Sequence, residues 1–95
     1  MEIEASSNNV KINGNIKTVS DFQKIKQKLD AVTKEHKSLV IHMIDSLSIT
    51  SSVIGYLNKL VLKDNIQIQM KVGNEQLLEL LNDLSLTSTF NAKRA

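Results

Sequence analysis

The chain has 95 residues, of which 41% are apolar, and its twelve basic and ten acidic side chains leave a net charge of +2. This length supports one hydrophobic core, so we expect a single domain, and the absence of cysteine excludes disulfides and thiolate metal sites. No apolar run is long enough to span a bilayer and no signal-peptide pattern opens the sequence, so we expect a cytoplasmic protein without membrane contact. Aromatic residues make up 3% of the chain and the basic residues form no dense stripe, so we expect no nucleic-acid partner.

Two short strands are expected at the beginning of the chain. Residues 1–5 alternate weakly between polar and apolar, as in a short edge strand. Val10 and Ile12 indicate a second strand that ends at a turn around Gly14. Gly14 is expected to provide a backbone conformation or a close approach that other residues resist.

The first helix is expected to begin near Ser20. Ser20 and Gln23 have the spacing of a capping box, in which each side chain bonds a free amide at the start of the helix. The buried stripe is expected from apolar residues at helical spacing, namely Phe22, Ile25, Leu29 and Val32.

A central strand and a hydroxyl-rich loop follow. Residues 39–44 are almost continuously apolar apart from His42, which predicts a strand covered on both faces. Residues 46–52 are rich in serine and threonine, and a second helix is expected to begin at Ser51 or Ser52. The loop therefore lies at the carboxyl end of a central strand, where parallel sheets gather their sites.

The last part of the chain predicts one more strand and one more helix. Residues 66–72 alternate strictly, and Asn74 is expected to cap a leucine-rich helix after the turn at Gly73. The predicted order is β-β-α-β-α-β-α, an α/β fold with a small, mostly parallel mixed sheet of about four strands and three helices. The domain is expected to span residues 1–90, with 91–95 as a short polar tail.

Catalytic groups do not converge in this pattern. A Ser–His–Asp grouping of Ser51, His42 and Asp45 would need residues 42 and 45 on one face, but a strand presents them on opposite faces. The second histidine, His36, lies in a charged connection, and the glycines are isolated rather than grouped in a phosphate loop. We therefore predict no catalytic residues, no metal site and no cofactor.

Three segments together resemble the STAS domain family, specifically the bacterial anti-sigma factor antagonists. Gly14, Asn15 and Ile16 stand where the family has a Gly-x-Leu turn. The apolar strand LVIHMIDSLSIT leads to residues 50–55, which stand against the family's Asp-Ser-Ser-Gly-Leu-Gly signature, and LLNDLSLTSTF is similar to its leucine-rich close. The resemblance covers residues 1–90, with Thr50 replacing the signature Asp and Val53 replacing its first Gly.

The resemblance implies a regulator rather than an enzyme. Members of this type bind an anti-sigma factor serine kinase, are released when that kinase phosphorylates the first signature serine, here Ser51, and are reset by a PP2C-type phosphatase. We expect a monomer or a weak dimer. Val53 is expected to add bulk to the surface that a kinase approaches, and Gly55 to allow close packing of the helix on the sheet. The expected partner contacts are Asn15, Thr18, Thr50, Ser52, Val53 and Tyr56.

Two other interpretations remain open. A hydroxyl at a helix N-terminus is commonly only a cap, which applies to Thr50 or Ser52. If these hydroxyls are only caps, the chain is an unphosphorylated STAS adaptor subunit of a larger complex, such as a lipid-transport ABC system. A small-molecule binder is the third interpretation, for which the sequence offers no recognisable set of polar pocket residues.

Overall fold

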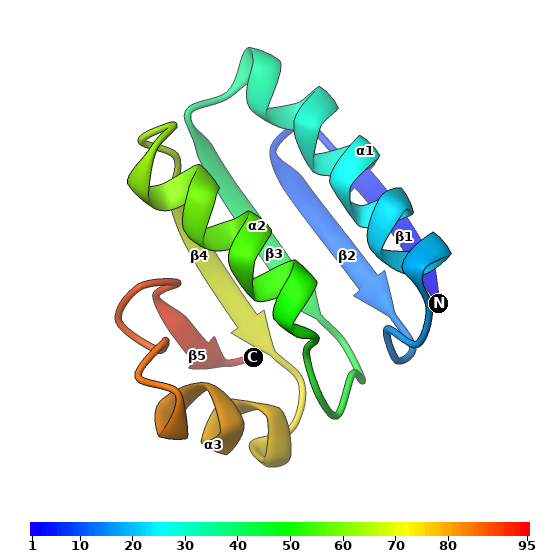
Figure 1. The fold of residues 1–95 in the computed structure, drawn as a ribbon, viewed down its shortest axis with the longest axis vertical. Helices are drawn as coiled ribbons and strands as arrows, with labels where there is room; N and C mark the ends of the chain where they lie inside the picture. Colours follow the sequence, from blue (N-terminus) through cyan, green and yellow to red (C-terminus); the bar gives the residue numbers. More distant parts are fainter.

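A computed structural model describes all 95 residues and confirms the α/β class (Figure 1). Three helices and a five-stranded mixed sheet follow one another in the order β-β-α-β-α-β-α-β. The elements are β1 (Glu2–Ser6), β2 (Asn9–Asn13), α1 (Val19–Glu35), β3 (Ser38–Met43), α2 (Ser51–Leu62), β4 (Gln67–Val72), α3 (Glu75–Asp83) and β5 (Ala92–Arg94).

The strands lie in the sheet in the order in which they occur in the chain, β1-β2-β3-β4-β5. The β1–β2 hairpin is antiparallel, and every other neighbouring pair is parallel. Ile12, Met43 and Val72 lie opposite one another at the carboxyl ends of β2, β3 and β4. The loops that leave these three strands therefore meet at one edge of the sheet.

Helices α1 and α2 cover the same face of the sheet, and α3 lies beside β5 (Figure 1). The inward residues of the strands and the apolar stripes of the helices form one core of 21 buried residues. The opposite face of the sheet is uncovered, which corrects the prediction that both faces of the central strand are buried. Val40 and His42 of β3 point to this face and are only half-buried, because the crossovers through α1 and α2 both pass over the other side.

Helix α1 begins at Val19, one residue before the predicted start, and its cap is Thr18 rather than Ser20. The Thr18 hydroxyl accepts a hydrogen bond from the Asp21 amide at 3.0 Å, and the Asp21 carboxylate accepts one from the Lys17 amide at 2.9 Å. The bond from Lys17 lowers the pKa of Asp21 below its usual range. Ser20 and Gln23 were thus the wrong pair, because the capping interaction lies two residues earlier.

The fifth strand, β5, was not predicted, and it lies in the residues expected to be a polar tail. Ala92–Arg94 pair in parallel with Met70–Val72 of β4. Ser85 and Asn91 adopt positive φ angles of 59° and 48°, which turn the chain back toward the sheet. Phe90 lies between these two residues in the chain, and its fully buried side chain anchors the segment to the core. No helix in the structure combines the length and apolar content needed to cross a membrane.

Candidate functional site

The hydroxyl-rich loop between β3 and α2 is held in place by the turns on both sides of it. Ser46 is 0% exposed, and its hydroxyl donates to the Gly14 carbonyl at 2.7 Å. Its own carbonyl accepts a hydrogen bond from the Asn74 side-chain amide at 2.6 Å. The first serine of the cluster is therefore a structural residue, because its hydroxyl and its carbonyl are both hydrogen-bonded within the fold and the residue is not available to a partner.

The turn between β2 and α1 makes two further bonds to the loop. The Asp45 carboxylate accepts a hydrogen bond from the Gly14 amide at 2.5 Å, and the Asn15 side-chain oxygen accepts one from the Leu47 amide at 2.9 Å. Gly14 has a φ of +87°, in the region where glycine is favoured, as predicted. Asn15, expected to contact a partner, is half-buried and uses its side-chain oxygen to hold the loop.

The turn between β4 and α3 supports the loop from the other side. A Cβ added at Gly73 would lie 1.8 Å from the Ile44 carbonyl oxygen, so only glycine allows the two backbones to pass this closely. Asn74 caps α3 by accepting from the Leu77 amide at 2.8 Å, as predicted, while its side-chain amide holds Ser46. These contacts make residues 44–50 a braced platform that leads into α2.

Ser51 is the first residue of α2 and its side chain is exposed, as is that of Ser52. Thr50 is the helix cap, and its hydroxyl accepts a hydrogen bond from the Val53 amide at 3.3 Å. The first turn of α2 contains no acidic residue. The exposed hydroxyl of Ser51 therefore lies at the positive end of the helix dipole, beside amides that the helix itself does not satisfy.

Val53 and Tyr56, both expected to contact a partner, are core residues. Val53 is 2% exposed and Tyr56 is 6% exposed. Their positions follow from helical spacing, because residues 53, 56, 57 and 60 form the stripe of α2 that faces the sheet and α1. Neither side chain is available to a partner, and Val53 adds no bulk to the molecular surface.

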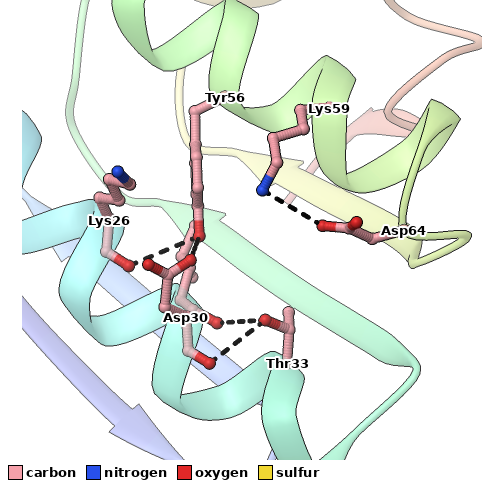
Figure 2. Close-up of polar contacts among 7 residues, drawn as sticks. Lys26, Asp30, Thr33, Tyr56, Lys59 and Asp64 are labelled. Carbon is pink, nitrogen blue, oxygen red and sulfur yellow. Dashed lines mark hydrogen bonds and ion pairs between the residues drawn. The ribbon is translucent and has the colours of Figure 1, made fainter.

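Tyr56 connects α2 to α1 (Figure 2). Its hydroxyl donates to the Asp30 carboxylate, and its ring meets the Phe22 ring edge to face with centroids 6.3 Å apart. Burial, together with the bond to Asp30, raises the pKa of Tyr56 far above its ordinary value. Lys59, on the same helix, forms an ion pair with Asp64 at 3.5 Å (Figure 2).

Gly55 does not have the role that the sequence suggested, and His42 lies apart from Ser51. A Cβ added at Gly55 would meet nothing within 4 Å, so this glycine faces solvent rather than allowing close packing on the sheet. His42 lies on the uncovered face of the sheet, whereas Ser51 lies at its carboxyl edge, so the two side chains do not approach each other. No group of three His, Asp or Glu side chains is arranged to hold a metal ion.

Two exposed apolar side chains at this edge were not singled out from the sequence. Leu47, four residues before Ser51, is 44% exposed, and Val19, next to the cap residue Thr18, is 73% exposed. Leu47 lies on the braced platform and is bonded to the turn that leads into α1, and Val19 is the first residue of that helix. The sequence signal that could have identified them is an apolar residue that does not belong to the buried stripe of any predicted helix or strand.

Comparison with protein-family models, with curated proteins and with solved structures finds no match to this chain. The geometry of the edge around Ser51 therefore carries the functional argument.

Proposed function

We propose that the protein is a STAS-like regulator of the anti-sigma factor antagonist type, whose binding to a partner is switched by phosphorylation of Ser51. The partner is an anti-sigma factor serine kinase, and a PP2C-type phosphatase restores the unmodified form. The observation that carries the proposal is an exposed Ser51 hydroxyl at the first position of α2, on a loop braced from both sides.

The environment of Ser51 favours a phosphate there. A phosphoserine adds close to two negative charges, which the N-terminus of a helix stabilises through its dipole and its unpaired amides. The absence of an acidic residue from the first turn of α2 avoids repulsion within that turn. The added charge should therefore change the stability of the fold little and act mainly on the binding of a partner at this surface.

Thr50 and Val53, two of the departures from the family signature, are compatible with this proposal. Thr50 fills the cap position that the family gives to Asp, and its hydroxyl performs the capping bond. Val53 lies in the core, so the bulk that distinguishes it from glycine does not obstruct the approach to Ser51. Both substitutions leave the acceptor hydroxyl exposed.

The surface around Ser51 has the composition of a protein contact. Exposed Leu47 and Val19 supply apolar area, while Thr18 and Ser52 supply polar groups beside it. Binding surfaces commonly combine a small apolar centre with a polar rim. A phosphate on Ser51 would place a solvated charge against the apolar part, which costs binding free energy unless the partner pairs it.

The test measures both modification and binding. Phosphopeptide mapping of the protein from its own cells should find phosphate on Ser51. A partner captured with the unmodified protein should bind Ser51→Ala about as well as the native chain. It should bind Ser51→Asp about tenfold or more weakly, because an unpaired charge at the contact costs about 1.4 kcal/mol or more.

Ser88→Asp is the matched control, since Ser88 is an exposed hydroxyl in the connection between α3 and β5 and the variant adds the same charge. It should retain most of the affinity. The Ser51→Asp variant should also melt slightly higher than the native chain, because a carboxylate in the first turn stabilises a helix. If Ser51 carries no phosphate and both Ser51 variants bind normally, the switch is refuted and the unphosphorylated adaptor becomes the better account.

A further inference from the structure

The uncovered face of the sheet carries a row of three lysines and one histidine that the proposed switch does not use. Lys11, His42, Lys71 and Lys93 lie opposite one another in register on β2, β3, β4 and β5. We call these four residues the basic row. Neighbouring strands are about 4.8 Å apart, so the row spans about 14 Å across the sheet.

The three lysines of the basic row form no ion pair within their own molecule. The chain's two ion pairs are Lys59–Asp64 and Arg94–Glu75, so none of the three lysines has a carboxylate within ion-pair distance. Glu4 lies opposite Lys11 in the hairpin register, at the far end of the row from β5. Like charges placed directly opposite, as Lys71 and Lys93 are, destabilise a sheet, so folding alone does not account for them.

The part of the row on β3, β4 and β5 lines a hollow of about 540 Å³. No acidic side chain lines this hollow, and its polar wall also includes Gln69, Asn91 and Arg94. The face has no exposed aromatic side chain on which bases could stack, which argues against single-stranded nucleic acid as its occupant. The basic row is therefore suited to bind anionic groups on the surface of another molecule.

Helix α3 presents such a surface. Glu75, Glu79 and Asp83 recur every four residues on its exposed side, so their Cα atoms span about 12 Å along one face of the helix. We call these three residues the acidic stripe. Its length is close to that of the basic row, and long lysine side chains can absorb the difference in spacing. Glu75 already contacts Arg94 at 3.5 Å, so Glu79 and Asp83 are the unpaired members.

The acidic stripe and the basic row cannot meet within one molecule. Leu77 and Leu81 of α3 are buried in the core on the helix-covered side of the sheet, and the row lies on the other side. We propose that the basic row of one molecule binds the acidic stripe of a second copy. This contact is heterologous, so it leaves one free row and one free stripe at the ends and builds chains or closed rings.

Exposed ion pairs are individually weak and are screened by salt, so the assembly is expected at high protein concentration and low ionic strength. Sedimentation velocity should show a sedimentation coefficient that rises with protein concentration at about 0.01 M salt, where the Debye length is about 30 Å. The rise should disappear at about 1 M salt, where that length is about 3 Å.

Charge reversal tests the pairing itself. Lys71→Glu combined with Lys93→Glu, and separately Glu79→Lys combined with Asp83→Lys, should each stay monomeric at low salt. An equimolar mixture of the two variants should associate again, because the reversed row of one meets the reversed stripe of the other. The control combines Lys24→Glu with Lys28→Glu, on the exposed side of α1. It lowers the net charge by the same amount as the variant at Lys71 and Lys93, and it should associate as the native chain does. If a double variant is unfolded by circular dichroism, Lys93→Glu and Asp83→Lys replace the pairs.

The proposal is overturned if the native chain stays monomeric at low salt. It is also overturned if the mixture of folded variants does not associate, or if the α1 control loses association as well. Binding of inorganic polyphosphate that depends on Lys71 and Lys93, without any self-association, would assign the row to a polyanion instead. Ser51→Asp should leave self-association unchanged, so this experiment and the test of the phosphorylation switch fail separately.

Discussion

At the scale of single residues, the three glycines of the chain have different structural roles. Gly14 is required for its backbone conformation, with a φ of +87°, and Gly73 for the close approach of a neighbouring carbonyl. Gly55 has neither requirement, because it lies inside α2 with open space where its side chain would be. A glycine in this position only increases the flexibility of the unfolded chain and of the helix.

We predict that Gly55→Ala stabilises the protein. Alanine has a higher helix propensity by about 0.8–1.0 kcal/mol, and the added methyl group meets no atom within 4 Å. For a domain of this size, each kcal/mol corresponds to a shift in Tm of about 4–8 °C, which calorimetry measures directly. Gly73→Ala is the control and should lower Tm, since its Cβ would overlap the Ile44 carbonyl oxygen. A lower Tm for Gly55→Ala would mean that this face of α2 is not open.

At the scale of elements, the bond between Tyr56 and Asp30 fixes how α2 lies against α1 (Figure 2). Tyr56 is the only tyrosine in the chain, and its ring also meets Phe22 of α1. The position of α2 determines where its first residue, Ser51, is presented. A side chain within the core thus sets the orientation of the candidate regulatory surface.

We predict that Tyr56→Phe lowers the free energy of unfolding by about 1–2 kcal/mol at neutral pH, because it removes a hydrogen bond to a carboxylate. The loss should shrink at alkaline pH. The pKa of Tyr56 is raised in the folded state, so above its ordinary value of 10.0 the unfolded tyrosine ionises while the folded one stays protonated. The native chain therefore loses this part of its stability as the pH rises through 10.0 and beyond.

Urea unfolding of both proteins from neutral pH to about pH 11 checks this prediction, because titrations common to the two cancel in the difference. If the difference in unfolding free energy between the two proteins stays constant with pH, the Tyr56 hydroxyl ionises as easily in the folded protein as in the unfolded one, and the prediction is wrong. Tyrosinate absorbance offers an independent measurement, since it reports on Tyr56 alone.

At the scale of the whole molecule, the chain closes its core with a residue close to its end. Phe90 is fully buried, and its carbonyl accepts a hydrogen bond from the Met70 amide of β4 at 3.1 Å. The aromatic ring and the backbone of this segment together bring β5 to the edge of the sheet. Much of the stability is therefore expected to depend on the last ten residues.

We predict that Phe90→Ala lowers the free energy of unfolding by about 3–5 kcal/mol, the usual cost of removing a buried aromatic ring. That is a large part of the total of about 5–15 kcal/mol for a typical domain, so the variant should be partly unfolded at 37 °C. Denaturant unfolding measures the difference. Phe22→Ala, at a half-buried ring, is the matched control and should lose less; equal losses would mean that Phe90 does not close the core.

The sequence predicted those parts of the fold in which side chains repeat with a clear period. Strand β4 alternates between exposed and buried residues throughout, and the cap of α3 at Asn74 was identified from its residue type. Strand β5 escaped prediction because it joins the sheet through backbone pairing with β4 and has no alternating side chains. The turns around it depend on positive φ angles at Ser85 and Asn91, which the residue types alone do not specify.

The candidate site was only partly predictable for a related reason. The exposure of Ser51 follows from its place at a loop-to-helix junction, and that of Ser52 from the helical phase. The roles of Ser46 and Asn15 depend on hydrogen bonds to residues that lie 32 positions away in the chain. The burial of Tyr56 was readable from its spacing with the apolar residues of α2, but its polar tip suggested the surface.

The sequential arrangement of the strands has a consequence for how the chain is made. Because each strand neighbours the one synthesised just before it, the growing polypeptide adds every new strand at a free border. No strand has to enter between two that are already paired, so no earlier hydrogen bonds need to open during synthesis. The last border to be filled receives β5, and only then does the emerging chain enclose its interior.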